Sequence, residues 1–354
     1  MKQKWIDETL KYLLILIIAA IIGAILILIK GEDPLKLAGE VFRYALGTRA
    51  GIASTLRWAS PVILTGLGIA IAFRVGIGNI GVEGQLYVAA LVTAILGYSL
   101  TSLPPIPLKI VAILGGMIAA ALYALIPAFL LVKWRVNEIL STMMLNYVAT
   151  WGTEYVVRAF FMESTAVVPR LIATREILPA ARLGQLMPPY DLNTSLMIGV
   201  VLCVLFYLMY RFTRLGYMLN TLGGNKRFAR YGGLNITALT FLVFALSGAV
   251  GGIGGSAEIL GIHRKFINGF SAGIGWDGLL VSLIAKNNPL GIIPAGLFWG
   301  LLKNSGFIVE RISSVNRWTI YVLQAVIVLL VTADLYVRPY LKRKAAAAKE
   351  SEVV

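Results

Sequence analysis

Long uncharged apolar runs alternate along the chain with short segments that contain Gly, Pro and charged residues. A helix needs about 20 apolar residues to cross the ~30 Å hydrocarbon core of a bilayer. The runs are continuous rather than alternating, which excludes a transmembrane barrel. The pattern therefore predicts an all-α, polytopic membrane protein with about ten transmembrane elements. They cover residues 12–30, 52–73, 80–101, 106–132, 137–160, 194–212, 236–261, 274–286, 289–306 and 318–340.

The first apolar run is too long for the hydrophobic region of a signal peptide, and no small-residue cleavage site follows it. Residues 31–34, Gly-Glu-Asp-Pro, have the character of a helix stop just after the membrane. We therefore expect a retained first span within a single transmembrane domain, residues 1–340. An even number of spans and basic residues at both ends place both termini in the cytoplasm. Residues 341–354 form a basic tail that we expect to be disordered.

Two breaks interrupt apolar regions, at residues 74–84 and 286–291. Paired interruptions in the two halves of a chain are typical of internally repeated transporters, in which discontinuous helices build the substrate site. A division into five plus five elements would give the halves opposite orientations. The sequence thus suggests two broken elements and an inverted repeat.

The first break carries four glycines and the polar residues Arg74, Asn79, Glu83 and Gln85. Polar groups at membrane depth must face protein or a water-filled cavity. One interpretation is a broken helix that lines a translocation path. The other is a glycine-lined helix contact with Arg74 and Glu83 at the cytoplasmic surface.

The element that follows residue 136 begins with Asn137, a good N-cap, and carries Thr142 and Asn146 on one face. Polar pairs of this kind usually bond across helices, which accounts best for Thr142. Asn146 beside Tyr147 would suit either such a bond or the binding of a polar, aromatic solute. Further along, Trp276 and Asp277 begin a short apolar run, and Asn-Asn-Pro at 287–289 forces a turn. We expect Asp277 to cap that helix, at a position that could lie near the path.

Two connections are long. Residues 162–193 form a predicted external loop with four prolines, and residues 211–235 form a predicted cytoplasmic loop rich in basic and aromatic residues. Connections in helical bundles usually have 2–8 residues. The cytoplasmic loop would suit docking into a groove of another protein, or an interfacial helix resting on lipid headgroups.

Composition narrows the function. The chain is 58% hydrophobic and 14% charged, whereas soluble domains average about 25% charged residues. Its net charge of +15 sits in short clusters between apolar runs, which is typical of cytoplasmic loops beside anionic lipid and argues against nucleic-acid binding. Some predicted external loops are basic too, at Lys36, Arg43, Arg49 and Arg57. One histidine and one cysteine leave no metal cluster or disulfide, and no P-loop or Gly-x-Ser-x-Gly elbow occurs. We expect neither a cofactor nor an enzymatic activity in this chain.

Four motifs together resemble the permease subunits of bacterial ATP-binding-cassette (ABC) importers, in the simple sugar and nucleoside branch of the branched-chain amino acid/ribose-type superfamily. They are Asn-Ile-Gly-Val-Glu-Gly-Gln at 79–85, Val-Asn-Glu through Met-Leu-Asn-Tyr at 136–147, Gly-Asn through Ala-Arg-Tyr-Gly-Gly-Leu-Asn at 224–235, and Gly-Trp-Asp-Gly through Asn-Pro-Leu-Gly at 275–291. The chain is most similar to the longer permease of nucleoside uptake systems. Arg74, Val75, Gly78 and Lys226 depart from the residues common in that family, so the resemblance does not fix the details of substrate choice.

The resemblance implies a permease in the bacterial inner membrane that pairs with a second, homologous permease, as a heterodimer. Two ATP-binding subunits would hydrolyse ATP below it, and an extracellular substrate-binding lipoprotein would deliver the solute above. The residues implied for the substrate path are Phe73, Asn79, Glu83, Gln85, Asn146, Tyr147, Trp276 and Asp277. Those implied for coupling to the ATPase are Gly224, Asn225, Arg230, Tyr231, Gly232 and Asn235.

The function expected from these residues is translocation of nucleosides, or of simple sugars, by alternating access. Asn, Gln and aromatic side chains suit bonding and stacking of a base. The alternative is a secondary transporter or channel for a small polar solute, which would need an intramembrane charge relay. Candidates for that relay are Glu83, Glu154, Glu258 and Asp277. A membrane enzyme acting on lipid has no visible catalytic constellation.

Overall fold

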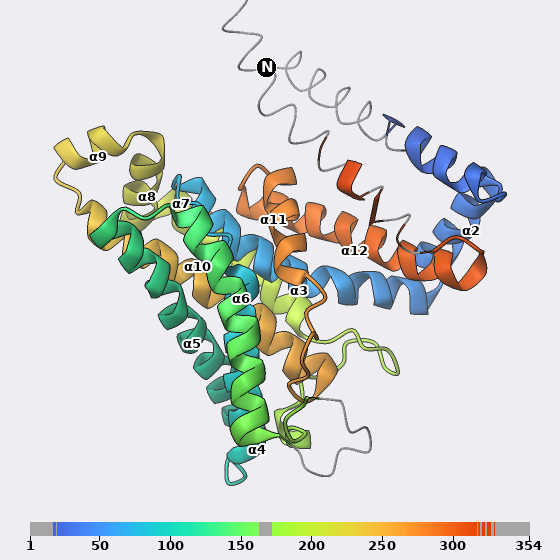
Figure 1. The fold of residues 1–354 in the computed structure, drawn as a ribbon, viewed down its shortest axis with the longest axis horizontal. Helices are drawn as coiled ribbons and strands as arrows, with labels where there is room; N and C mark the ends of the chain where they lie inside the picture. The colour runs from blue at the N-terminus through green and yellow to red at the C-terminus, as the bar shows by residue number, and fades with distance from the viewer. Residues whose placement is uncertain are drawn as a thin grey trace, which may run out of the picture. The chain divides into compact units, whose positions relative to one another are not determined.

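The computed structural model describes residues 17–18, 20–162, 172–316, 318, 321–322, 324–326 and 329 (Figure 1). The start of the predicted first span, the tip of the loop at 162–193, most of the predicted element at 318–340 and the tail at 341–354 lie outside these residues. The described part is built almost entirely from helices, with no strand among the described residues, so the all-α prediction is confirmed.

The helices follow the predicted runs closely. They are α2 (Pro34–Gly47), α3 (Arg49–Arg74), α4 (Val82–Ser99), α5 (Pro105–Trp134), α6 (Glu138–Val156), α7 (Ser195–Phe212), α8 (Arg214–Gly224), α9 (Lys226–Tyr231), α10 (Ile236–Glu258), α11 (Ile274–Ile284) and α12 (Pro289–Ile312). Helices α6 and α10 each continue into a π-helical turn, Val157–Phe161 and Ile259–His263.

Six helices of the described chain are long and apolar enough to cross a membrane: α3, α4, α5, α7, α10 with its π-helical turn, and α12. Helix α11 and the helix at Ala20–Ile29 are apolar but shorter. The protein is thus a multi-pass membrane protein. Ten spans and an inverted repeat stay predictions.

Helix α2 corrects one expectation, because it occupies a segment that the sequence pattern assigned to an external loop. The side chain of Asp33 accepts hydrogen bonds from the backbone N–H groups of Leu35 and Lys36 at 2.9 and 3.2 Å. Pro34 takes the first helical position, where its missing N–H costs nothing. Asp33 and Pro34 therefore start a helix, four residues after the preceding helix ends at Ile29.

The described residues fall into two compact units, one within residues 1–52 and 302–354 and the other within residues 53–301. In the first unit, Leu37 and Val41 of α2 pack with Val309 and Val315. The exposed carboxylate of Glu32 accepts hydrogen bonds from the backbone N–H and the hydroxyl of Ser314, at 3.1 and 2.9 Å. These bonds lower the pKa of Glu32.

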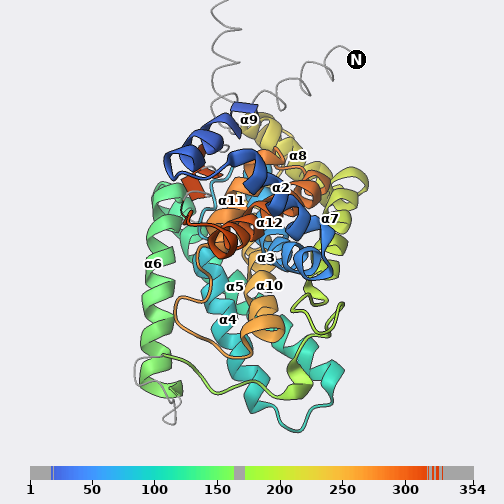
Figure 2. The ribbon, with the colours of Figure 1, turned by 90° about the vertical axis from the view of Figure 1, so that its right-hand side faces the viewer.

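The core of the second unit is formed by α4, α5 and α10, which pack closely against one another (Figure 2). Small residues allow this approach. A Cβ at Gly252 would lie 2.5 Å from that of Ala120, and one at Gly255 would lie 2.2 Å from the carbonyl oxygen of Leu86. Membrane helices associate through such small-residue contacts and through hydrogen bonds between helices. Here the hydroxyls of Thr93 and Ser256 supply a bond of 2.7 Å.

Candidate functional site

Both predicted breaks are present. Helix α3 ends at Arg74 and α4 begins at Val82, so residues 75–81 lie between two helices. The backbone N–H groups of Val75 and Ile77 both bond to the carbonyl of Ala72, and Gly76 takes a φ of +76°. That left-handed conformation favours glycine. The second break lies between α11 and α12, where Lys286 and Asn287 take φ values of 51° and 56°.

The fully buried side chain of Asn79 organises the first break. Its amide nitrogen donates to the hydroxyl of Ser247 at 2.8 Å and to the side chain of Gln85 at 3.3 Å. Its oxygen accepts from the backbone N–H of Gly81 at 2.9 Å and from the amide of Gln85 at 3.2 Å. Ser247 in turn donates to the carbonyl of Gly68 at 2.6 Å. This network joins α3, the break, α4 and α10 through polar groups that burial would otherwise leave unsatisfied.

Helix α6 supports the same break from another side. The side chain of Asn146 accepts from the backbone N–H of Gly84 at 2.8 Å and donates to the carbonyl of Ile80 at 3.0 Å. The hydroxyl of Thr142 accepts from the N–H of Ile80 at 3.2 Å. Thr142, predicted to bond across helices, therefore bonds to the break between α3 and α4, whereas Asn146 bonds both to the break and to the first turn of α4. Asn137 caps α6 as predicted, accepting from the N–H of Leu140 at 3.1 Å.

Glu83 connects the first break with α11. Its buried carboxylate accepts a hydrogen bond of 2.6 Å from the backbone N–H of Gly275, in the first turn of α11. A negative group at this end is favoured by the helix dipole. A Cβ at Gly275 would lie 2.6 Å from Cα of Glu83, so only glycine permits the approach.

Asp277 does not cap α11 as predicted. The helix begins three residues earlier, at Ile274, and the hydroxyl of Ser271 accepts from the Ile274 N–H at 3.0 Å. Asp277 is the fourth helical residue, and its own backbone N–H bonds to the carbonyl of Gly273 at 2.9 Å. The cap was misplaced because Gly273, with a φ of +86°, begins the helix without an Asp, Asn, Ser or Thr at the cap position.

The residues predicted to line a path therefore fall into three groups. Asn79, Glu83, Gln85 and Asn146 are buried and bonded around the first turn of α4. Phe73, Trp276 and Asp277 are partly buried. Tyr147, by contrast, is 57% exposed on α6. Ser247 is a partner that sequence reasoning missed, although it stands at the start of the glycine-rich stretch of α10 and lies 168 residues from Asn79.

The exposed face of α6 carries several aromatic side chains. It presents Tyr147, Trp151 and Tyr155, each more than half exposed. Met197, Val201 and Leu205, on the exposed side of α7, are by contrast aliphatic or thioether side chains. Lipid tails require no hydrogen-bonding groups from a helix. The aromatic face of α6, with its two phenol hydroxyls, is therefore better suited to a polar partner than to hydrocarbon.

Residues 213–235 of the predicted cytoplasmic loop 211–235, which we call the coupling segment after the role expected of it, contain the two short helices α8 and α9. The side chain of Asn225, directly after Gly224, caps α9 by accepting from the N–H groups of Arg227 and Phe228, both at 3.0 Å. Asn235 caps α10 by accepting from the N–H of Ala238 at 3.0 Å. Gly232 ends α9, donating its N–H to the carbonyl of Phe228 at 2.9 Å. The short helix α9 thus lies between Gly224 and Gly232.

One side of the coupling segment is buried and the other is exposed. Leu219, Leu222 and Ala229 belong to an apolar cluster that also contains Val75 and Ile77 of the first break. A Cβ at Gly223 would lie 2.4 Å from the carbonyl oxygen of Arg74, so α8 contacts the backbone at the end of α3. On the opposite side, Phe228 is 62% and Tyr231 91% exposed, and Arg230 is exposed as well.

A charged cluster lies at the other end of α10. The guanidinium of Arg57 donates to the carboxylate of Glu258 at 3.2 Å, and Nε2 of His263 lies 3.3 Å from the same oxygen. Glu258 is thus held by a cation, as a buried carboxylate requires. Within the described residues no three His, Cys, Asp or Glu side chains gather as they would around a metal ion.

Comparison with known proteins finds one protein family and several ABC transporter permeases that match most of the chain. Residues 51–332 match the family described as "Branched-chain amino acid transport system / permease component". A glucose ABC transporter permease protein of Haloferax volcanii is 31% identical, over 90% of this chain and 86% of its own length. A guanosine ABC transporter permease protein of Bacillus subtilis is 27% identical over 94% and 96%. A nucleoside ABC transporter permease protein of Lactococcus lactis is 27% identical over 82% of each chain. The last two organisms each have a second permease that also matches.

Proposed function

This chain belongs to the family of branched-chain amino acid transport system permease components and is a permease subunit of an ABC transporter, and we propose that it imports nucleosides. Two relatives named for nucleoside or guanosine transport match it over more than four-fifths of its length. The chemistry of α6 supports the same choice. The exposed rings of Tyr147, Trp151 and Tyr155 can stack on a nucleobase, and the phenols can bond to its edges or to a ribose hydroxyl.

The observation that carries the proposed mechanism is the contact between the coupling segment and the first break. Gly223 of α8 rests on the backbone of Arg74, and Leu222 packs in one cluster with Val75 and Ile77. The break is in turn bonded to α4, α6 and α10 through Asn79 and Asn146. A displacement of α8 would therefore reach the helices around the proposed path without crossing a flexible linker.

The exposed face of α9 is proposed as the docking surface for an ATP-binding subunit. It offers Phe228, Arg230 and Tyr231 on a helix whose other side is anchored by Ala229. Aromatic residues and arginine are enriched where binding energy concentrates at interfaces. Asn225 and Asn235 serve this surface by capping α9 and α10, and Gly232 serves it by ending α9; Gly224 is the last residue of α8, and a Cβ there would meet nothing within 4 Å.

The partners follow from the class of transporter. We propose a heterodimer with a second permease, two ATP-binding subunits at the α8–α9 end, and an extracellular binding lipoprotein at the opposite end. The matching permease pairs in two organisms support the heterodimer. In this arrangement the chain lies in the inner membrane of a bacterial cell, with both termini and the coupling segment in the cytoplasm.

A simple sugar is the second candidate substrate. The relative with 31% identity is named for glucose transport, and a sugar would use the same phenol hydroxyls without base stacking. Uptake by the complete complex in proteoliposomes, with its binding protein outside and ATP inside, separates the candidates. We expect accumulation of radiolabelled guanosine or adenosine that excess ribose or glucose does not inhibit. Transport of a sugar with no transport of any nucleoside would contradict the nucleoside proposal.

A further inference from the structure

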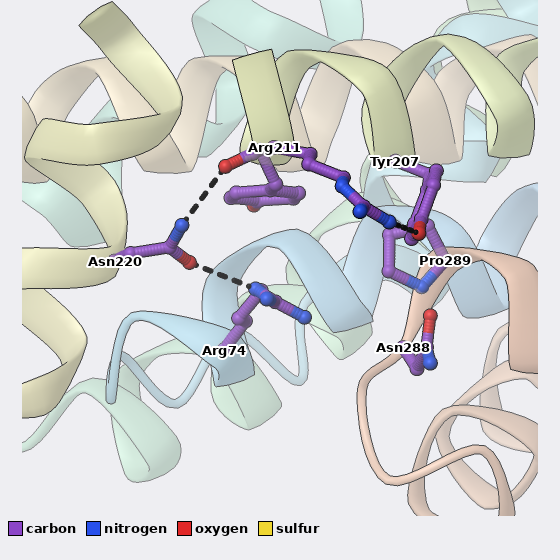
Figure 3. Close-up of a pocket in the computed structure, with 7 residues that line it drawn as sticks. Arg74, Tyr207, Arg211, Asn220, Asn288 and Pro289 are labelled. Atoms are coloured by element: carbon purple, nitrogen blue, oxygen red, sulfur yellow. Dashed lines mark hydrogen bonds between the residues drawn. The ribbon is translucent and has the colours of Figure 1, made fainter. Parts of the chain in front are cut away.

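An open pocket of about 300 Å³ lies where α3, α7, α8 and the turn before α12 meet (Figure 3). Its walls are formed by Arg74, Tyr207, Arg211, Asn220 and Asn288, among others. The pocket is distinct from the exposed face of α9 and from the proposed path on α6. Neither of those functions accounts for it.

The pocket is positively charged. Its lining contains two arginines and, within the described residues, no carboxylate. Arg74 is fixed from two sides: its Nε donates to Oδ1 of Asn220 at 3.2 Å, and its guanidinium lies 4.6 Å from the ring centroid of Tyr210. The amide of Asn220 is held by the carbonyl of Tyr210 at 3.0 Å. This arrangement pre-orients one cation toward the pocket.

The second cation comes from α7. One NH2 group of Arg211 donates to the hydroxyl of Tyr207 at 2.8 Å (Figure 3). No hydrogen bond within the described residues uses the NH2 groups of Arg74 or the second NH2 group of Arg211. Paired guanidinium groups with unused N–H donors match the geometry of phosphate oxygens.

The position of Arg211 on α7 indicates which kind of molecule would carry such a phosphate. Residues 197, 201, 204, 208 and 211 follow one face of the helix at a period close to 3.6, and the first four are exposed apolar side chains. Helix α7 is among the least buried of the spans. This face is thus a surface for lipid tails, and Arg211 stands in the last turn, where the tails give way to headgroups.

We propose that the pocket between Arg74 and Arg211 binds the phosphate of an anionic phospholipid whose acyl chains lie along α7. The lipid would join the end of α7 to the end of α3 and to α8. Free phosphate has the same charged oxygens as the headgroup, but it has no acyl chains to bind along the exposed apolar face of α7. An acidic side chain of an ATP-binding subunit is the competing occupant, and the test below distinguishes all three.

The experiment uses the full-length chain purified with the subunits that accompany it, delipidated in detergent and titrated with phosphatidylglycerol. Native mass spectrometry counts bound lipid, and phosphatidylcholine serves as the zwitterionic comparison. We expect one phosphatidylglycerol molecule that binds the wild type more tightly than phosphatidylcholine does. Because Arg211→Gln loses a charge-assisted contact, its affinity for phosphatidylglycerol should fall about tenfold, and the double variant with Arg74→Gln should bind the lipid more weakly still. Equal binding of both lipids by the wild type would overturn the proposal.

The matched control is the double variant Lys133→Gln and Arg214→Gln, which removes two exposed cations outside the pocket lining. It should keep the lipid. Because Arg74 also packs on Tyr210, Arg211→Gln is the decisive variant if the double variant fails to fold. Unchanged lipid binding in Arg211→Gln would overturn the proposal. Displacement of the lipid by millimolar inorganic phosphate alone would overturn it too, because the pocket would then be a site for free phosphate. So would an Arg211→Gln variant that loses the ATP-binding subunit but still binds the lipid, because the pocket would then hold an acidic side chain of that subunit.

Discussion

The side-chain amide of Asn146 forms two hydrogen bonds at the first break. Its oxygen accepts from the N–H of Gly84 at 2.8 Å, and its nitrogen donates to the carbonyl of Ile80 at 3.0 Å. These backbone groups belong to the end of the break and the first turn of α4. Helix starts leave their first N–H groups without partners inside the helix. A side chain on α6 thus supplies hydrogen-bond partners for two backbone groups that would otherwise be unpaired in the interior of the protein.

We predict that Asn146→Ala lowers the thermal stability of the protein. It would leave the N–H of Gly84 and the carbonyl of Ile80 unsatisfied and buried, at a cost of about 1–3 kcal/mol for each group. Thermal unfolding followed by intrinsic fluorescence in detergent measures the loss. Tyr147→Ala is the neighbouring control, because the Tyr147 side chain is more than half exposed. We expect Tyr147→Ala to unfold near the wild-type temperature but to raise the KM for nucleoside uptake. A reversed pattern would contradict both assignments.

A second prediction concerns the buried carboxylate of Glu83, which accepts from the N–H of Gly275 at 2.6 Å. In Glu83→Gln the side-chain oxygen can still accept this bond, whereas in Glu83→Ala it is lost. We expect a small decrease in unfolding temperature for Gln and a larger one for Ala, reflecting about 1–3 kcal/mol for the orphaned donor. Differential scanning fluorimetry of the purified variants measures this order.

The same pair of variants separates an ATP-driven permease from a proton-coupled transporter. If Glu83 acts as an acceptor that holds α11, Glu83→Gln should retain ATP-dependent uptake with an unchanged dependence on external pH. If Glu83 belonged to a charge relay, the neutral amide would abolish uptake, and a protonophore would abolish it in the wild type. We expect the first outcome, measured in proteoliposomes with internal ATP.

Local signals in the sequence were sufficient for the breaks and for several caps. Glycine at position 76 and the Asn-Asn-Pro run at 287–289 ended helices where expected, and Asn137 capped α6. Each depends on residues only a few positions apart. Helix α2 was missed because Lys36, Glu40 and Arg43 interrupt its apolar positions, so that it contains no long uncharged run, and because Asp33-Pro34 was interpreted only as a stop.

The site could be anticipated only in part. The sequence identified Asn79, Glu83, Gln85 and Asn146 as polar residues at membrane depth, but their partners follow from packing between distant helices. Asn79 meets Ser247 across 168 residues, and Glu83 meets Gly275 across 192. No periodicity within one helix encodes such pairs. Whether these residues also contact a solute stays a prediction.

The exposed face of α9 carries the third prediction. Arg230 and Tyr231 are exposed, so replacing both with alanine should leave the fold and membrane insertion intact. We expect the double variant to lose stimulation of ATP hydrolysis by substrate-loaded binding protein, together with uptake. Tyr217→Ala is the control, since Tyr217 is an exposed aromatic of α8 in the same segment. ATPase activity and uptake are measured on one preparation, and normal transport in the double variant would remove the docking role.

The fourth prediction uses two neighbouring glycines at the end of α8. A Cβ at Gly223 would lie 2.4 Å from the carbonyl oxygen of Arg74 and 3.0 Å from Cα of Val75, whereas a Cβ at Gly224 meets nothing within 4 Å. Gly223→Ala must therefore shift α8 away from the first break, at about 1–3 kcal/mol for overpacking. Gly224→Ala introduces the same methyl group one residue later without this contact.

If α8 transmits motion to the break, the two variants should differ in coupling more than in assembly. We expect Gly223→Ala to keep its ATP-binding subunits on size-exclusion chromatography, yet to take up less nucleoside for each ATP hydrolysed. Gly224→Ala should match the wild type in both measurements. Equal coupling ratios in the two variants, with Gly223→Ala lowered only in thermal stability, would mean that the contact with Arg74 supports the fold alone. A lowered ratio confined to Gly223→Ala would place the path of mechanical coupling at the point where α8 meets the end of α3.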